Sequence, residues 1–442
     1  MRIAVLSLHT SPAAQPGQGD AGGMNVYVRA TAAELARAGH TVEIFTADPL
    51  APTTGTVELA PGVRLHQLDT AARDKTALAD DVPALAAALA AHPAFAGSDV
   101  IWAHYWISAL AGLALTGRSG PAEETDPAEE TDPAEQPDAT GQSDPAPRLV
   151  VSFHTIAAVK DRDTGAALEP AQRRRAEERI AAGADLLVAN TEAEAADMVA
   201  LLGADPARIV TAMPGVDLAT FTPGPMHTAR RAVGEQDADL LLLYVGRMQH
   251  VKGTDTAVEA LAALTRLDPV LAARTRLVML GAASGEGTDP AALTALTARI
   301  DSAGLHGRVE ILPPVPAAVL ADWYRAADLV LVPSRSESFG FAAAEAQACG
   351  APVVASAVGG LTHVVEAGRT GLLVAEDDPL TWAEGIEALL CDPAARARMG
   401  AAAAQRAREF DWRTCAATVL AAVPAAPDAL PGTADARGGG DR

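Results

Sequence analysis

The sequence has few cysteines and no long apolar run. Cys349, Cys391 and Cys415 form no Cys-X-X-Cys pair and leave an odd count, so we expect neither a zinc site nor a disulfide framework. No stretch offers about 18 uninterrupted apolar residues, so a transmembrane helix is not expected. The first residues, Met1 to His9, lack a signal-peptide pattern. We therefore expect a soluble cytoplasmic protein.

Basic residues are outnumbered by acidic ones. The chain of 442 residues has 34 Lys and Arg against 56 Asp and Glu, a formal net charge of −22. Net repulsion argues against binding to nucleic acid or to an anionic membrane. An anionic substrate must therefore be held by a local cluster of Lys and Arg.

Apolar runs of strand length alternate with amphipathic stretches, which is typical of βα units around parallel sheets. At about 150 residues per domain the length allows two or three domains, and we predict two. The predicted strands are Ile3–Leu8, Thr41–Thr46, Val100–Ala103, Leu149–Phe153, Leu186–Ala189, Leu240–Val245, Arg276–Leu280, Val309–Leu312, Leu329–Val332 and Pro352–Ala355.

Three segments depart from this alternation. Residues 213–230 are rich in Pro and Gly and are predicted to link the domains. Residues 117–147 include a near-tandem acidic hexapeptide without large apolar residues, so we expect a disordered insertion. A helical stretch over 401–423 is interrupted near Phe410–Trp412, and a disordered tail is expected over 425–442.

The segment from Leu329 to Glu345 contains two carboxylates, Glu337 and Glu345, eight residues apart across a polar turn. In a helix they would be separated by about 12 Å. Paired glycosidase carboxylates lie roughly 5 to 10 Å apart, so this spacing disfavours a hydrolase. It suits one long polar ligand over a helix N-terminus, with each carboxylate accepting hydrogen bonds from a sugar hydroxyl. A nucleotide sugar has that shape.

Two glycine-containing loops follow predicted strands. Residues 19–25 precede a predicted helix over 26–38, and their glycines allow close approach of an anionic ligand. Residues 246–253 place Arg247 and Lys252 in a glycine-bounded loop, which suits a diphosphate. A flexible loop and a solvated turn are the respective alternatives, and we favour binding in both.

Other polar residues give weaker signals. His9, His154 and Thr155 stand at predicted strand ends, where site residues gather in parallel sheets. The rings at 104–106 are expected to serve packing. At least two of the three arginines at 173–175 are expected on a solvated helix face, and Lys75 shows no pattern.

Taken together and in order, several segments resemble the retaining GT-B glycosyltransferases of family 4. This resemblance implies two Rossmann-like domains facing across a cleft: an acceptor domain over 1–212, joined by a returning helix over 410–424, and a nucleotide-sugar domain over 213–409. The block around 15–27 points to members that use inositol phosphate. The matching segments are His9–Val28, His104–Ser108, Ser152–Asp161, Ala189–Glu194, Pro214–Gly224, Val245–Gly253 and Tyr324–Leu361.

The resemblance also implies substrates and site residues. The expected reaction is retaining transfer of N-acetylglucosamine from UDP-N-acetylglucosamine to 1D-myo-inositol 3-phosphate, the first step of mycothiol biosynthesis. A homodimer is possible in this family. The implied catalytic residues are His154, Glu337, Arg247 and Lys252. Donor contacts would come from Gln15, Pro16, Gly23, Arg247, Lys252, Val315, Glu337 and Glu345. Acceptor contacts would come from His9, Asp20, Ala21, Gly22, Gly23, Met24, Asn25, Lys75, Tyr105, Thr155 and Arg173. A structural magnesium ion would be bound through backbone oxygens near Tyr324, Arg325, Ala327 and Ala351.

Alternative functions remain open at this point. Another family 4 transferase could use a lipid-linked inositol or a hexose phosphate as acceptor. A nicotinamide-dependent oxidoreductase is disfavoured because the Gly-X-Gly-X-X-Gly fingerprint is absent. A non-catalytic nucleotide-sugar sensor is opposed by the retention of both carboxylates and both cations.

Overall fold

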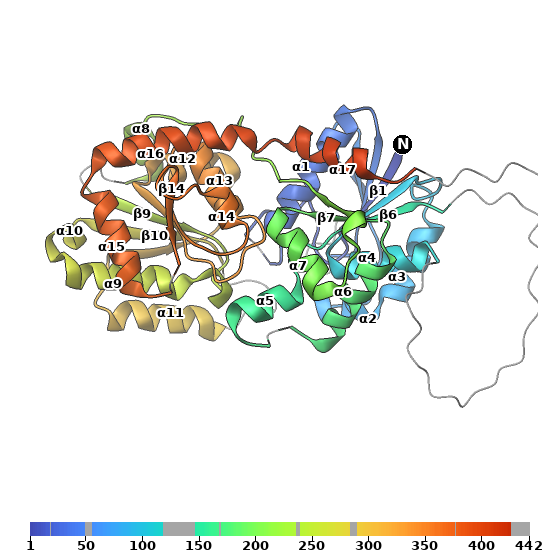
Figure 1. Ribbon diagram of the computed structural model, residues 1–442, viewed down its shortest axis with the longest axis horizontal. Helices are drawn as coiled ribbons and strands as arrows, with labels where there is room; N and C mark the ends of the chain where they lie inside the picture. Colours follow the sequence, from blue (N-terminus) through green and yellow to red (C-terminus); the bar gives the residue numbers. More distant parts are fainter. Residues whose placement is uncertain are drawn as a thin grey trace, which may run out of the picture.

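The computed structural model consists of two α/β lobes side by side (Figure 1). Because the acidic insertion and the tail fall largely outside the described residues, the predictions made for them remain predictions. The structure describes residues 1–17, 19–48, 55–117, 146–167, 169–235, 239–282, 290–375 and 377–425.

The N-terminal lobe is built on an eight-stranded sheet with the order β3-β4-β2-β1-β5-β6-β7-β8. Every pair is parallel except β3 with β4. Helices cover both faces, so the central strands are buried over most of their length. The strands are β1 (Arg2–Leu6), β2 (Thr41–Thr46), β3 (Thr56–Ala60), β4 (Val63–Gln67), β5 (Val100–His104), β6 (Arg148–Ser152), β7 (Leu186–Ala189) and β8 (Ile209–Thr211).

The alternation of side chains along β1 divides the core of this lobe in two. Ala4 and Leu6 pack with α3, α4 and α6 on one face of the sheet, whereas Ile3 and Val5 pack with α1 and the C-terminal helix α17 on the other. The helices of the lobe are α1 (Gly23–Arg37), α2 (Lys75–Asp80), α3 (Val82–Ala91), α4 (Tyr105–Leu115), α5 (Ala157–Thr164), α6 (Ala171–Gly183), α7 (Glu192–Leu202), the 3₁₀ helix η1 (Pro206–Arg208) and α17 (Trp412–Ala422).

The C-terminal lobe contains a six-stranded, fully parallel sheet in the order β11-β10-β9-β12-β13-β14. Leu241 and Leu243 of β9 face one layer of helices, and Leu242 and Tyr244 face the other. The strands are β9 (Leu240–Val245), β10 (Thr275–Leu280), β11 (Val309–Leu312), β12 (Leu329–Val332), β13 (Val353–Ser356) and β14 (Gly371–Val374). The helices are α8 (Met226–Val233), η2 (His250–Lys252), α9 (Thr254–Leu267), α10 (Pro269–Ala273), α11 (Pro290–Ser302), α12 (Ala317–Ala326), α13 (Phe341–Ala348), α14 (Leu361–Val364), α15 (Pro379–Leu390), α16 (Pro393–Arg406) and η3 (Ala407–Glu409).

The chain passes between the lobes twice, and the two crossings lie against each other. The backbone N–H of Val216 donates to the carbonyl of Phe410 at 3.0 Å. A Cβ on Gly215 would lie 2.3 Å from the backbone nitrogen of Trp412, so only glycine permits this approach. After the second crossing α17 packs beside α1 (Figure 1).

The predicted fold class is confirmed, with local differences. Each predicted strand is present with ends shifted by at most two residues, but the short edge strands β3, β8 and β14 and the neighbouring β4 were not predicted. Helix α1 starts at Gly23, three residues earlier than expected, and α8 occupies the end of the predicted linker. Among the described helices, none combines the length and the apolarity needed to cross a bilayer.

Candidate active site

A cavity of about 250 Å³ lies between the lobes at the carboxyl ends of the parallel strands. Two residues that line it, Tyr105 and His154, have φ values of 73° and 61° and follow β5 and β6. Positive φ is unusual for residues other than glycine, and such strained positions gather at functional sites. Here the strain turns both residues toward the space between the lobes.

Many of the residues implied by the family resemblance line this cavity, and some do not. The N-terminal lobe contributes His9, Asp20, Gly22, Gly23, Met24, Lys75, Tyr105, His154, Thr155 and Arg173. The C-terminal lobe contributes Arg247, Lys252 and Glu337. The remaining implied residues lie outside the lining: Gln15, Pro16, Ala21, Asn25, Val315, Glu345, Tyr324, Arg325, Ala327 and Ala351.

The buried Asn25 holds the glycine loop in place from behind. Its side chain accepts a hydrogen bond from Gly22 N–H at 2.8 Å and donates to Thr10 Oγ1 at 3.0 Å. Gln15 instead reaches the other lobe, where its Nε2 donates to the carbonyl of Pro314 at 3.4 Å, beside Val315.

On the N-terminal lobe's side of the cavity, two cationic side chains lie near one aromatic ring. Lys75 Nζ lies 4.6 Å from the centre of the Tyr105 ring, and the Arg173 guanidinium lies 4.8 Å from it. The His9 ring lies 4.3 Å from the same ring. Burial lowers the pKa of His9 well below its ordinary value, with further lowering by the nearby cations Lys75, Arg173 and Arg247, so His9 is neutral. The positive charge near the ring therefore comes from Lys75 and Arg173.

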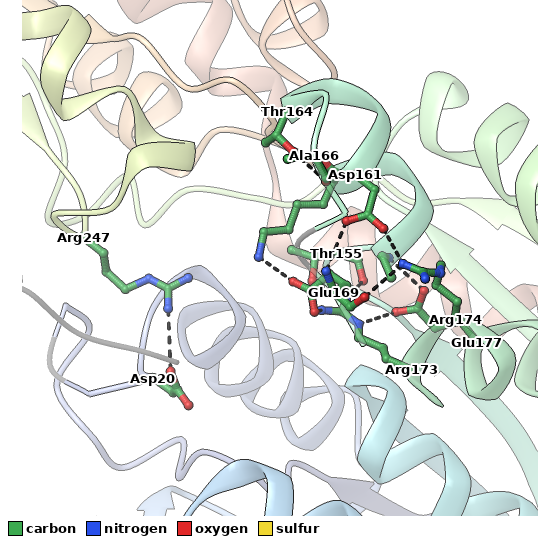
Figure 2. Close-up of polar contacts among 12 residues, drawn as sticks. Asp20, Thr155, Asp161, Thr164, Ala166, Glu169, Arg173, Arg174, Glu177 and Arg247 are labelled. Atoms are coloured by element: carbon green, nitrogen blue, oxygen red, sulfur yellow. Dashed lines mark hydrogen bonds and ion pairs between the residues drawn. The ribbon is translucent and has the colours of Figure 1, made fainter. Parts of the chain in front are cut away.

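Arg173 is buried, with only 3% of its side chain exposed. Its Nε donates to Glu177 at 2.7 Å, and its Nη2 donates to the carbonyl and to Oγ1 of Thr155 at 2.8 and 2.9 Å (Figure 2). Burial disfavours its charge, but Tyr105, Glu177 and Glu169 raise the pKa of Arg173 overall. Arg173 is therefore a fixed cation.

The neighbouring arginines of α6 differ from Arg173. Arg175 is exposed, and Arg174 is half-buried and donates to Asp161 at 2.6 Å. Arg173 shares a face of α6 with the buried Ala176 and Ile180, at the i, i+3, i+7 spacing of a helix face turned inward. This periodicity was the signal that could have singled out Arg173 from sequence.

On the C-terminal lobe's side of the cavity, the two loop cations have carboxylate partners. Lys252 Nζ lies 2.7 Å from Glu337 Oε2. Figure 2 shows the other pair, in which Arg247 Nη1 lies 3.8 Å from Asp20 Oδ1 across the cleft. The loop is also fixed from behind, because a Cβ on Gly253, at φ 68°, would lie 1.8 Å from the carbonyl oxygen of Pro333. The backbone there permits no other residue without rearrangement.

Some cavity residues had no clear sequence signal. Ser336 Oγ donates to Asp163 Oδ2 at 2.8 Å, and Ser338 Oγ donates to the carbonyl of His154 at 2.7 Å. Both hydrogen bonds join the two lobes. The two serines flank Glu337, so the polar composition of this turn was the available clue in the sequence. The residues to which the serines donate lie more than 170 positions away in the chain.

Two buried histidines form a neutral pair at the base of the cavity. His104 Nδ1 lies 2.9 Å from His154 Nε2. Burial lowers the pKa of His154 to about 3, and burial together with His154 lowers the pKa of His104. The ring of His154 is therefore neutral at physiological pH and supplies no positive charge to the site.

Glu345 lies in α13, outside the lining of the cavity. The Tyr324 hydroxyl donates to its Oε2 at 3.0 Å. Burial raises the pKa of Glu345 to about 7. The structure therefore brings one carboxylate of the predicted pair, Glu337, into this cavity and leaves the other bonded to a tyrosine.

The raised pKa of Glu345 predicts a pH-dependent stability. A carboxyl group whose folded pKa exceeds its unfolded value binds more protons in the folded state, so stability falls as pH rises from about 4.5 to about 7. Glutamine cannot ionise, so the stability of Glu345→Gln is expected to fall less than that of the parent over this pH range. Urea unfolding of both proteins from pH 4.5 to 8 measures it, and parallel curves would show that Glu345 does not titrate in this range.

The residues implied for magnesium do not offer carboxylate or other anionic side chains. The guanidinium of Arg325 already donates to the carbonyls of Thr222 and Thr220 at 2.7 and 2.8 Å. Across the residues that the structure describes, no group of three His, Cys, Asp or Glu is placed to hold a metal ion. A magnesium ion bound here through backbone oxygens, as the resemblance implies, stays a prediction, and the mechanism below uses no metal.

Two lobes built on predominantly parallel sheets, with a polar cavity between their strand ends, are the architecture of GT-B glycosyltransferases. Residues 22–215 match the family described as "Glycosyl transferase 4-like domain", and residues 226–406 match "Glycosyl transferases group 1". The chain belongs to the group 1 glycosyltransferases, and it is an enzyme of this class. The resemblance inferred from sequence is thereby confirmed.

Particular relatives are similar over nearly their full length. The D-inositol 3-phosphate glycosyltransferase of Kineococcus radiotolerans is 44% identical and covers 95% of this chain and 94% of its own. The enzyme of the same name from Thermobifida fusca is 40% identical, with coverages of 95% and 92%.

Solved structures share the fold. Sucrose-phosphate synthase from Thermosynechococcus elongatus has a TM-score of 0.81 and 28% identity, and covers 95% of this chain and 97% of its own. Anabaena HepE in complex with UDP-glucose has a TM-score of 0.68 and 19% identity, with coverages of 95% and 99%.

Proposed function

We propose that this enzyme transfers N-acetylglucosamine, with retention of configuration, from UDP-N-acetylglucosamine to 1D-myo-inositol 3-phosphate, the first step of mycothiol biosynthesis. The observation that carries the proposal is that Lys75 and Arg173, which lie near the Tyr105 ring, share one cavity with Arg247 and Lys252. One pair of cations suits a phosphate monoester and the other a diphosphate. The names of the relatives support the inositol phosphate acceptor.

For the donor, the proposed diphosphate site is the loop around Arg247 and Lys252 with Gly23 opposite. Glu337 would accept hydrogen bonds from the transferred sugar. Gln15, Pro16, Val315 and Glu345 would contribute to the nucleoside end. The structural likeness to a protein solved with UDP-glucose supports the fold of this domain. The choice of N-acetylglucosamine rests on the family resemblance.

The proposed mechanism is same-face substitution. Arg247 and Lys252 would neutralise the charge that builds on the leaving diphosphate, which in turn would take the acceptor proton. The neutral ring of His154 is unsuited to act as a proton donor, whereas its backbone carbonyl could support the positive sugar centre. Trapping a glycosyl adduct on a side chain of the enzyme would overturn this mechanism.

The decisive experiment measures UDP release from UDP-N-acetylglucosamine with and without inositol 3-phosphate. We expect release that depends on the acceptor, together with a glycosylated inositol phosphate in mass spectrometry. If UDP is released only with a lipid-linked inositol or a hexose phosphate, that compound would replace inositol 3-phosphate as the acceptor. Binding of the nucleotide sugar without any turnover would indicate a sensor instead of an enzyme of this specificity.

A further inference from the structure

A buried carboxylate, Glu169, lies in the acceptor side of the cavity and has no role in the reaction proposed above. Only 8% of its side chain is exposed. Its Oε1 lies 2.5 Å from Lys160 Nζ and its Oε2 lies 2.9 Å from Arg173 Nη1. Figure 2 shows Glu169 next to Thr155 and Arg173. These three residues and Lys160 all line the cavity.

Glu169 is negatively charged at neutral pH. Burial alone would raise the pKa of its carboxyl, but Arg173, Lys160 and Lys75 lower it overall. Burial raises the pKa of Glu177, and its ion pair with Arg173 opposes that rise. Counting Glu177 as ionised, Lys75, Lys160 and Arg173 face two carboxylates, which leaves a net charge of +1 on these five side chains. A phosphate monoester dianion would bring this to about −1.

Glu169 also competes with a ligand for Arg173. A guanidinium has five N–H groups. Hydrogen bonds to Glu177 and to two oxygens of Thr155 use three of them, and Nη1 forms an ion pair with Glu169. An anion that binds to Arg173 would therefore lie beside Glu169, whose carboxylate is already paired with the same guanidinium.

We propose that Glu169 determines the specificity of the acceptor site by charge: it admits a single phosphate group and opposes a ligand with a second one nearby. This inference rests on the proposed inositol phosphate acceptor. A second phosphate adds close to two negative charges next to a fixed carboxylate, and like charges in a partly desolvated site repel strongly. Rejecting a wrong ligand by repulsion is a common route to specificity.

The test compares two ligands on the UDP-saturated enzyme by calorimetry: 1D-myo-inositol 3-phosphate and 1D-myo-inositol 3,4-bisphosphate. Glu169→Gln is expected to improve binding of the bisphosphate, relative to the monophosphate, by about tenfold. Glu169→Asp retains the charge and is expected to keep the preference of the parent. Glu178→Gln, at an exposed position of α6, controls for the change in overall charge.

The possible outcomes separate this inference from the proposed function. If Glu169 only holds Lys160 and Arg173 in place, Glu169→Gln would weaken the binding of both ligands equally. The ratio of the two affinities would then be unchanged, and the assignment of Glu169 would be overturned. Failure of the parent enzyme to bind the monophosphate would overturn the proposed acceptor, and the inference with it. Kinetic constants with both ligands as acceptors give a second reading of the same ratio.

Discussion

Arg173→Ala is expected to destabilise the protein and to weaken acceptor binding at once. Removing Arg173 leaves Glu177, which is fully buried, without its cation. Breaking a buried ion pair by removing one partner costs about 3 to 5 kcal/mol. The acceptor phosphate also loses a charge-assisted contact of roughly 1.5 to 3 kcal/mol, so its KM should rise about ten- to a hundredfold. The KM for the nucleotide sugar should change little.

Companion variants separate these two effects. Arg173→Ala combined with Glu177→Gln removes the stranded charge and is expected to regain stability in urea unfolding while the acceptor KM stays high. Lys75→Ala, at a half-buried position, should raise the acceptor KM without the loss of stability. If Lys75→Ala and Arg173→Ala both bind inositol phosphate like the parent, the acceptor site is wrongly assigned.

Lys252→Ala is expected to lower kcat by about 10² to 10³ with little change in stability. In the proposed mechanism Lys252 stabilises charge on the leaving diphosphate, and the loss of one such group typically costs this much. Its side chain is 24% exposed, so its removal opens no core cavity. Steady-state kinetics with saturating acceptor measures the loss. Arg266→Ala, at an exposed position of α9, is the matched control and should behave like the parent.

A second variant tests whether the effect belongs to Lys252 itself. Lys252→Ala also releases Glu337, which Lys252 holds at 2.7 Å. Because Glu337 is itself placed on the transferred sugar, the double variant Lys252→Ala with Glu337→Gln is compared with Glu337→Gln alone. If the free carboxylate caused the loss by repelling the donor, these two variants would have the same kcat. We expect a further loss in the double variant, and a kcat near that of the parent in Lys252→Ala alone would remove the diphosphate loop from the mechanism.

Much of the fold could be predicted because central parallel strands are buried on both faces. Runs such as Leu240–Val245 and Leu329–Val332 are apolar throughout, and both strands have the predicted bounds. The edge strands β3 and β8 were not predicted because they are not buried on both faces. β3 is exposed or half-buried along its length and β8 is half-buried, so neither carries a continuous apolar signal.

The site was predictable only where a local pattern accompanied the chemistry. The loop with Arg247 and Lys252 is bounded by glycines after a strand, and it lines the cavity as the pattern indicated. Glu345 lies eight residues from Glu337 in a segment that suggested a shared role, yet Tyr324 binds it outside the cavity lining. Sequence spacing could not reveal this, because the partner comes from a different helix.

The sequence by itself determined the alternation of strands and helices, the two sheets and the loops at the strand ends, since burial of apolar residues and glycine geometry act over short stretches of chain. Only the tertiary structure decided that Lys75 and Arg173 lie on one Tyr105 ring and that Ser338 bonds to His154 from the other lobe. Parallel crossovers bring the carboxyl ends of strands together regardless of their separation in sequence. The charge balance of the cavity is therefore a property of packing and not of any one segment.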